Sequence, residues 1–486
     1  MIFNSVTYLV FLGISVALYW ALPTRPRQWM LFVASLTFYG FWRPEFLILM
    51  IASASADFIA ARRIQALEAS RQRLGWLLLS LGINLGLLLY FKYLFFVLDN
   101  ARTILDVFGT QVSLPALDIV LPLGISFYTF QTISYTVDVY RRHTPAERDF
   151  LAYGCFVTFF PQLVAGPILR ASELLGQLAH RPKFRSEDMR IGLQRILDGL
   201  FLKVVLADNI SPLVDAGFAQ PASSLSALDV WTLAFMFGYQ IYFDFSAYSH
   251  IALGSARLMG IHFPENFNFP YAATSPRDFW RRWHISLSSW IRDYLYLPLL
   301  HARPQIHSVG GLAVAGSDFI KAQRRTIALF ATWAIMGLWH GANWTFIVWG
   351  VYHAALIAGY RVIEPAVAGL SEVSRRLGGW FVTLPLVMLG WIPFRAQSLA
   401  DVATLFGKLI SASSYTWLGM RENIYLIAAL ILAGLIGSHM LHHTSKWRGD
   451  SLAFAPLIAM TAWRGLQTFL VIVFLRPISQ FIYFQF

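Results

Sequence analysis

The residue with the clearest chemical potential in this sequence is a histidine, His340, in the segment Gly337-Leu-Trp-His-Gly-Ala-Asn-Trp344. An apolar run precedes the segment, so we expect His340 to lie deep in the protein, where ionisable groups usually face a cavity. A neutral imidazole at such a position can act as a general base. Two interpretations stay open, a general base or a structural histidine hydrogen-bonded to Asn343. Gly337 and Gly341, four residues apart, predict the close approach of another backbone.

A second histidine, His284, lies in a stretch rich in arginine and tryptophan at residues 277–294. If this stretch is one helix, Arg281, His284 and Ser288 form a polar stripe at spacings of three and four. Tryptophans form an apolar stripe on the opposite face, so the helix is expected to be amphipathic. Either it is an interfacial helix whose arginines reach water, or it lines a substrate space with His284 at its centre.

Two further apolar segments carry polar side chains at helical spacing. Asp244 and Tyr248 are four residues apart, and an aspartate at this depth needs a partner, for which arginines elsewhere are the candidates. Structural pairing and a direct role at the site both stay open for this pair. In the segment 122–138, four polar residues share one helix face, which predicts hydrogen bonds between helices or the lining of a cavity.

The composition indicates a membrane protein, and its helices must position these residues. Hydrophobic residues make up 57% of the 486 residues and charged residues 13%, against about 25% charged in soluble domains. Mean hydropathy is +0.55. No polar linker or internal repeat divides the chain, so we predict a single domain over residues 1–486. Cys155 is the only cysteine, which excludes an intrachain disulfide, and we predict no metal site.

The net charge of +12 comes from short basic clusters between apolar runs. Such clusters indicate cytoplasmic loops facing anionic lipid and not nucleic-acid binding; attraction of an anionic donor or polymer is the alternative. The N-terminus is then outside, and loops 62–74 and 141–149 are cytoplasmic. We predict an all-α, multi-pass protein with roughly ten or eleven transmembrane helices plus re-entrant and amphipathic helices. The candidate spans are residues 3–22, 28–42, 45–61, 75–98, 119–140, 151–169, 191–208, 229–259, 325–345, 346–363, 380–394, 422–441 and 463–484.

These segments resemble the membrane-bound O-acyltransferase family, in particular its bacterial alginate O-acetyltransferase group, along essentially the whole chain. The matching stretches are PLGISFYTFQTISYTVDVYR at 122–141, FFPQLVAGPILR at 159–170, QIYFDFSAYS at 240–249, FPENFNFPY at 263–271, DFWRRWHISLSSWIRDYLYLPL at 278–299, GLWHGANW at 337–344 and the terminal FIYFQF. The related D-alanyl transferases of teichoic acid share the two histidine-bearing segments but resemble the first and last stretches less closely.

The resemblance implies a ring of tilted helices around a central tunnel in a bacterial inner membrane. His340 matches the family's catalytic histidine, and His284 matches a second motif position where relatives carry His, Asn or Asp. An acyl thioester, either acetyl-CoA or a carrier-bound acyl group, is implied as the cytoplasmic donor substrate, with no bound cofactor. The implied acceptor is an exported, alginate-type polysaccharide, reached through periplasmic acetyltransferase or polysaccharide-synthesis partner proteins.

The residues suit this chemistry independently of the resemblance. Transfer from a thioester to a hydroxyl needs a base for the hydroxyl proton and donors for the tetrahedral oxyanion. His340 is the predicted base, whereas His284, an arginine or a backbone amide are open candidates for orienting the substrates. Direct transfer is the simpler prediction, and an acyl-enzyme intermediate is the alternative. The predicted catalytic residues are His340 and His284, and the predicted tunnel lining comprises Asp244, Tyr248, Arg281, Ser288, Trp339 and Asn343.

Two departures from the family pattern concern the acceptor or the partner. His250 stands where relatives carry Asp, and the segment 301–318 is longer than the corresponding loop. The rival from another class is a transporter or channel, which predicts an inverted repeat that this sequence does not show. A non-enzymatic export subunit leaves both histidine segments unexplained. Within the enzyme class, transfer of D-alanine or of another acyl group to an envelope polymer stays open.

Overall fold

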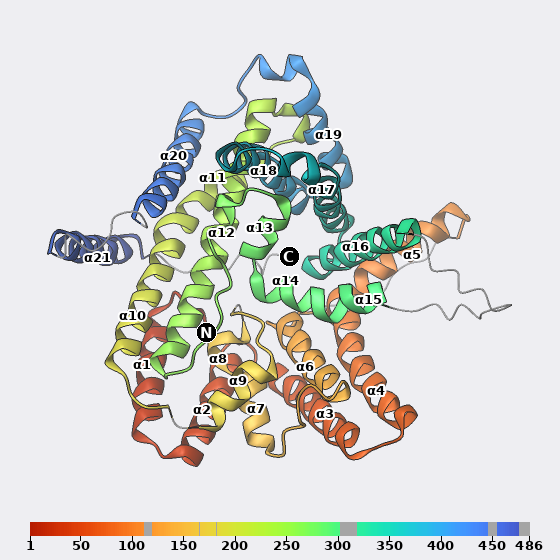
Figure 1. Ribbon diagram of the computed structural model, residues 1–486, viewed down its shortest axis with the longest axis vertical. Coiled ribbons are helices and arrows are strands. Elements are labelled where there is room, and N and C mark those ends of the chain that lie inside the picture. Colours follow the sequence, from red (N-terminus) through yellow and green to blue (C-terminus); the bar gives the residue numbers. More distant parts are fainter. Residues whose placement is uncertain (111–118, 165, 181, 302–317, 446–453, 476–486) are drawn as a thin grey trace. The chain divides into compact units, whose positions relative to one another are not determined.

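The structure is a computed structural model that describes residues 1–110, 119–164, 166–180, 182–301, 318–445 and 454–475. Every regular element within these ranges is a helix (Figure 1), which confirms the predicted all-α class. Two of the predicted features lie partly outside the described residues, namely the long segment 301–318 and the end of the last span.

The chain forms two compact units. Unit 1 comprises residues 1–200 and 247–265, and unit 2 comprises residues 201–246 and 266–486. The 32-residue helix α12 (Ala227–Leu258) contributes its first part to unit 2 and its last part to unit 1. Whether the two units work as the single domain predicted over the whole chain stays a prediction.

Unit 1 contains the N-terminal helices. These are α1 (Val6–Ala21), α2 (Thr24–Gly40), α3 (Phe46–Ala66), α4 (Ser70–Leu88), η1 (Leu89–Tyr93), α5 (Leu94–Val107), α6 (Ile125–Tyr140), α7 (Phe150–Thr158), α8 (Phe160–Leu163), α9 (Ala171–Ala179) and α10 (Ser186–Leu200). Side chains cap several of them. The Ser5 hydroxyl accepts the Tyr8 N–H at the start of α1, and the Asp149 carboxylate accepts the Leu151 N–H at the start of α7. The predicted span 151–169 contains two short helices, α7 and α8, which are separated at Phe159.

A buried polar cluster joins α3, α4 and α6 within unit 1. Asp57 of α3 is fully buried and accepts hydrogen bonds from Ser80 Oγ at 2.6 Å and Asn84 Nδ2 at 2.9 Å, both on α4. Thr132 of α6 donates to Asn84 Oδ1 at 3.1 Å. Hydrogen bonds of this kind hold helices together where lipid offers no hydrophobic driving force between them.

The polar face predicted on α6 makes hydrogen bonds with its neighbours. Gln131 Nε2 donates to the Phe156 carbonyl at 2.7 Å, and the Glu147 backbone N–H donates to the Tyr135 hydroxyl at 2.8 Å. The bond of Gln131 joins α6 to α7, as predicted for hydrogen bonding between helices, whereas Tyr135 bonds to the loop that precedes α7.

Unit 2 contains the remaining helices. These are η2 (Phe201–Ala207), α11 (Asp208–Phe218), η3 (Ala222–Ser224), η4 (Pro270–Ala272), α13 (Pro276–Arg282), α14 (Ile285–Ile291), η5 (Arg292–Tyr296), α15 (Leu297–His301), α16 (Asp318–His340), α17 (Trp344–Ala368), α18 (Glu372–Arg395), α19 (Leu399–Ile410), η6 (Ala412–Tyr415), α20 (Glu422–Ser445) and α21 (Phe454–Phe474).

Helices α16 and α17 pack with their backbones in close approach. A Cβ added at Gly337 would lie 2.1 Å from the Phe346 carbonyl oxygen, and one at Gly350 would lie 2.0 Å from that of Trp333. The predicted close approach at Gly337 is confirmed, because only glycine fits at these two positions. At Gly341 the neighbour is instead the ring of Phe346, 2.1 Å from an added Cβ.

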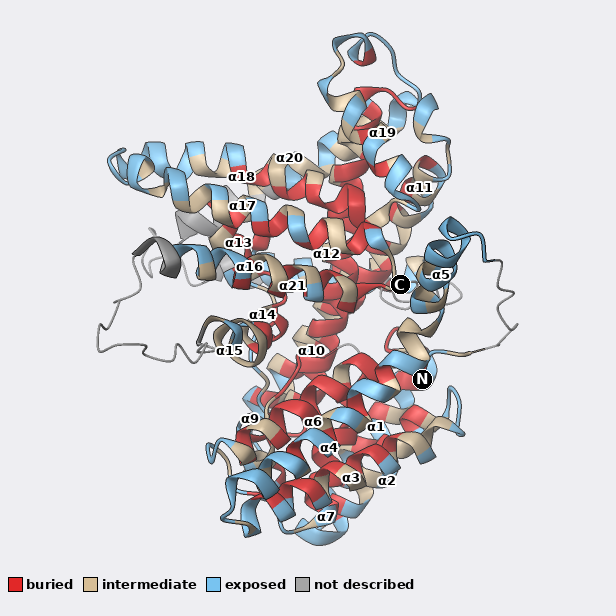
Figure 2. Cartoon of the chain, turned by 90° about the vertical axis from the view of Figure 1, so that its right-hand side faces the viewer, coloured by how far each residue is buried: buried red, intermediate tan, exposed pale blue. Residues whose placement is uncertain are grey.

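Three stretches of the described chain are long and apolar enough to cross a membrane, namely Ser70–Val107, α17 and α18. Between 22% and 50% of their most apolar windows is buried within the protein, so much of this apolar surface faces outward. Figure 2 shows α5, the end of the first stretch, exposed along most of its length. Exposed apolar surface on helices of this length is stable in lipid and not in water. The protein is thus a membrane protein, and the predicted number of ten or eleven spans stays a prediction.

The two loops predicted to be cytoplasmic lie beside each other in unit 1. Arg62 Nη1 donates to the Arg148 carbonyl at 3.3 Å, and Arg73 donates to the Tyr140 carbonyl. Because the loops are in contact, they must lie on the same side of the membrane.

Single cysteines in place of Glu68 and His143, both exposed, are expected to resist an impermeant thiol reagent in intact cells and to react after permeabilisation. Both cysteine variants are made in a Cys155→Ala background, which removes the native thiol, itself buried. A cysteine in place of Thr110, after the first long span, is the control that is expected to react from outside. Labelling of both loops from outside would invert the topology, and labelling of only one would contradict their contact.

Candidate functional site

His340 is the last residue of α16, at the turn into α17, and its side chain is buried. Its ring centroid lies 4.9 Å from that of Trp349 and 5.4 Å from that of Phe394, with both rings edge-on. The turn is closed by Asn343, whose side-chain oxygen accepts the Thr345 N–H at 3.1 Å and so caps α17. This cap is the observed role of Asn343. Trp339, the preceding residue, packs 4.9 Å from the imidazole.

His284 does not lie on a continuous helix, so the predicted amphipathic stripe over residues 277–294 is wrong. The stretch contains two short helices, α13 and α14, and His284 stands between them with φ of +41°. The reason is non-local. Asn268 N–H donates to the Arg282 carbonyl and Ile285 N–H donates to the Asn266 carbonyl, both at 2.9 Å. These bonds occupy backbone groups that a continuous helix would use within itself.

The break moves the members of the predicted stripe into different surroundings. His284 is fully buried, and the ring of Phe245 packs perpendicular to it at 4.6 Å. Ser288 is half-buried and donates to the Trp283 carbonyl at 3.2 Å, whereas Arg281 is exposed. Of the predicted polar stripe, His284 is thus buried and Arg281 is exposed to the surroundings of the protein. The tunnel-lining roles of Arg281 and Ser288 stay predictions.

Aromatic rings connect the surroundings of the two histidines within unit 2. Phe267, which stacks near His284, lies 5.1 Å from Trp283, and Trp283 lies 5.0 Å from Trp391. Trp391 in turn lies 5.5 Å from Phe394, the ring that contacts His340. Both histidines therefore belong to one aromatic region, formed by Phe267, by Trp283 between α13 and α14, and by rings of α17 and α18.

Asp244 pairs with a lysine where an arginine was predicted, which corrects the predicted partner. Lys203 Nζ lies 2.8 Å from the Asp244 carboxylate and 2.8 Å from that of Asp208. The side chains of Lys203 and Asp244 are only 2% and 4% exposed. Sequence reasoning missed Lys203, although a lone lysine within the apolar span 191–208 was a usable signal. Tyr248 lies on the part of α12 that belongs to unit 1, where its ring stacks 5.5 Å from Phe3.

Replacement of Lys203 by methionine is expected to destabilise the protein by about 3–5 kcal/mol, because it removes the cation from a buried carboxylate. Thermal unfolding in detergent, followed by tryptophan fluorescence, measures this loss. In the Asp244→Asn background the same change is expected to cost much less, since the buried charge is gone. Asp208→Asn is the milder control, because the Asp208 side chain is 20% exposed. Equal losses in both backgrounds would show that the pair is not energetically coupled.

A third buried histidine, His353, was not singled out from the sequence. It lies on α17, and its Nδ1 accepts a hydrogen bond from Trp280 Nε1 at 3.4 Å. Trp349, the ring that contacts His340, also packs against it at 5.1 Å. An isolated histidine in an apolar span gives no sequence signal that separates packing from chemistry.

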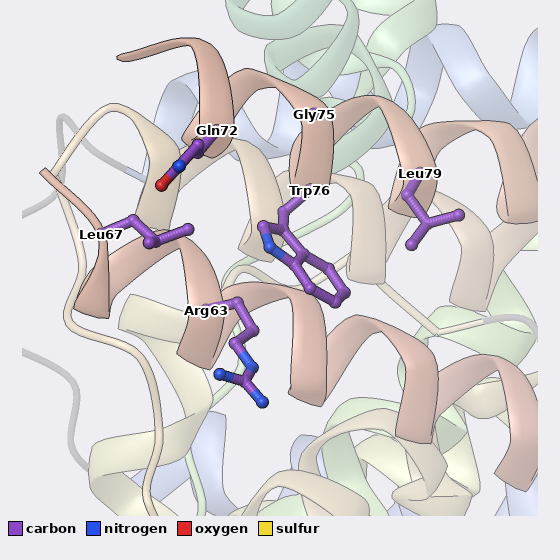
Figure 3. Close-up of a pocket in the computed structure, with 6 residues that line it drawn as sticks. All are labelled: Arg63, Leu67, Gln72, Gly75, Trp76 and Leu79. Atoms are coloured by element: carbon purple, nitrogen blue, oxygen red, sulfur yellow. The ribbon is translucent and has the colours of Figure 1, made fainter. Parts of the chain in front are cut away.

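An open cavity of about 350 Å³ lies elsewhere, in unit 1, where α3 ends and α4 begins. Figure 3 shows its lining by Arg63, Leu67, Gln72, Gly75, Trp76 and Leu79. It contains none of the predicted site residues, and its lining residues Arg63, Leu67 and Gln72 belong to the predicted cytoplasmic loop 62–74. Within the described part of the chain, no three His, Cys, Asp or Glu side chains are grouped as metal ligands would be.

Comparisons with known proteins identify relatives of this chain among acyltransferases. The model of a family described as MBOAT, membrane-bound O-acyltransferase family, matches residues 139–312. A probable alginate O-acetylase of Azotobacter vinelandii is 38% identical over 443 residues, covering 90% of this chain and 84% of the relative. A peptidoglycan O-acetyltransferase of Helicobacter pylori is 33% identical, covering 91% and 83%. A teichoic acid D-alanyltransferase of Bacillus subtilis is 31% identical and covers 50% of this chain and 59% of its own length.

Proposed function

Since this chain belongs to the membrane-bound O-acyltransferase family and is therefore an O-acyltransferase, we propose that it acetylates an exported polysaccharide. Within the family it belongs to the bacterial alginate O-acetyltransferase group. The proposed donor is a cytoplasmic thioester, either acetyl-CoA or a carrier-bound acetyl group. The proposed setting is a multi-pass protein of the bacterial inner membrane that works with periplasmic partner proteins. A tunnel through a ring of helices is the proposed route between the two substrates.

The proposal assigns the role of general base to His340. The hydroxyl oxygen attacks the thioester carbonyl carbon while His340 accepts the hydroxyl proton, and the tetrahedral intermediate then collapses and releases the thiolate. The observation that carries this assignment is the place of His340, buried at the turn between α16 and α17 among the rings of Trp349 and Phe394.

The extent of the similarities supports acetyl transfer over transfer of D-alanine. The alginate O-acetylase and the peptidoglycan O-acetyltransferase match about nine-tenths of the chain, whereas the D-alanyltransferase matches half of it. The names of these two relatives both specify the acetyl group, but one names alginate as the polymer and the other names peptidoglycan.

Purified protein in detergent is expected to release free CoA thiol from acetyl-CoA, with water as the default acceptor. In His340→Asn the rate of thiol release is expected to be lower by about 10²-fold or more. A transporter predicts no consumption of the thioester, but uptake of acetyl-CoA into proteoliposomes. Thiol release that is equal in the two proteins would remove His340 from the chemistry, and uptake without any release would favour the transporter.

A further inference from the structure

The side-chain oxygen of Asn266 lies at the centre of the backbone break that holds His284. Asn266 is 1% exposed, and its Oδ1 lies 3.1 Å from His284 Nδ1, 2.9 Å from Ser286 Oγ and 3.3 Å from the Ser286 backbone nitrogen. The backbone of Asn266 also accepts the Ile285 N–H at 2.9 Å. One residue thus holds the imidazole and both residues that follow it.

This arrangement determines which nitrogen of His284 carries the proton. A backbone N–H can only donate, so the Asn266 atom that faces the Ser286 amide must be the oxygen and not the amide nitrogen. An oxygen that faces His284 Nδ1 can only accept, so Nδ1 carries the hydrogen. In the neutral imidazole the lone pair is therefore on Nε2.

Nε2 of His284 is an acceptor with an open position. It is buried, and among the residues that the structure describes it has no hydrogen-bond partner. Phe245, perpendicular to the imidazole at 4.6 Å, and Phe267, stacked at 6.4 Å, provide only apolar neighbours. Because buried acceptors are nearly always satisfied, a hydrogen-bond donor outside the chain is the group that fits here.

We propose that Asn266 is a positioning residue, which fixes the tautomer of His284 so that Nε2 accepts a hydrogen bond from a hydroxyl neighbouring the one that is acylated. This inference rests on the proposed function, in which His340 takes the proton of the reacting hydroxyl. The neighbouring hydroxyl donates a hydrogen bond to Nε2 and keeps its proton, so no additional bond breaks. The acceptor favoured by such a site is a vicinal diol, as found along a sugar ring.

Two small alcohols of similar size separate this role from general structural support. The assay measures acetyl transfer from acetyl-CoA by the purified full-length protein to ethylene glycol, which has a neighbouring hydroxyl, and to ethanol, which has none. The wild type is expected to favour ethylene glycol by about tenfold, the value of one good hydrogen bond to a buried group. Asn266→Ala is expected to lose this preference, because its rate with ethylene glycol falls more than its rate with ethanol.

Three matched variants keep the test decisive if Asn266→Ala folds poorly. Asn266→Asp retains an acceptor oxygen and is expected to retain the preference for the diol. His284→Phe keeps a ring beside Phe245 but lacks Nε2, and is expected to lose the preference. Ser286→Ala removes one of the three contacts with Asn266 Oδ1 without touching the imidazole, and is expected to keep it.

The outcomes are distinguishable. A wild type without preference, or an equal fall with both alcohols in Asn266→Ala, would overturn the positioning role and leave the acyltransferase activity intact. A wild type that consumes no acetyl-CoA with either alcohol or with water would instead overturn the proposed function.

Discussion

Replacement of His340 by alanine is expected to abolish polymer acetylation while the protein stays folded in the membrane. Loss of a general base typically costs about 10²–10⁴-fold in rate, which would leave acetylation in cells below detection. The fold is expected to survive because the turn depends on the Asn343 cap and on the glycine contacts between α16 and α17, which the substitution leaves in place. Ester content of the exported polymer measures the first expectation, and the size-exclusion profile in detergent measures the second.

His180→Ala is the matched control, because His180 is exposed and lies in unit 1. It is expected to keep normal acetylation. Near-normal acetylation by a stably expressed His340→Ala protein would contradict the assignment of the base. A protein that is absent from the membrane would leave the question to the milder His340→Asn change, which keeps a polar side chain of smaller volume.

His284→Asn is expected to keep clearly more acetyltransferase activity than His340→Asn. The structure gives the reason. His284 Nδ1 faces Asn266 Oδ1 and donates to it, and in the proposed arrangement Nε2 accepts from the substrate; an amide can donate with its nitrogen and accept with its oxygen. A general base cannot be replaced in this way, because an amide has no usable basicity. We expect the rate to fall about 10²-fold or more in His340→Asn. The fall in rate in His284→Asn is expected to be at least about tenfold smaller.

The comparison requires equal amounts of folded protein, measured by size-exclusion chromatography, and initial rates of acetyl-CoA consumption. If His284→Asn is the more damaged of the two, the roles are exchanged and the base is the histidine between α13 and α14. That outcome is compatible with the tautomer that Asn266 selects, since Nε2 of His284 has the lone pair that a base needs.

The sequence predicted well what depends on local pattern. Long apolar runs with few charges predicted helices such as α1, α17 and α18, because hydropathy and helical length are properties of a contiguous segment. Gly337 correctly predicted the close approach of another backbone, which is that of α17, whereas Gly341 meets the ring of Phe346. The helices and this close approach both depend on residues that lie near each other in the sequence.

The sequence did not predict what depends on distant partners. The stretch 277–294 has helical spacing throughout, and the helix breaks at His284 because the backbone of residues 266–268 competes for its hydrogen bonds. The lysine that pairs with Asp244 comes from the π-helical segment η2, and no pattern links the two positions along the chain. Polar contacts between separate elements have no period, so composition and spacing cannot identify them.

The role of His340 as the general base can be measured by single-turnover transfer of radiolabelled acetyl from acetyl-CoA, catalysed by purified wild-type and His340→Asn protein. The wild type is expected to pass label to a hydroxyl acceptor or to water, and the variant to bind acetyl-CoA but transfer label at least about 10²-fold more slowly. Equal transfer by the two proteins, each shown to be folded, would contradict this role.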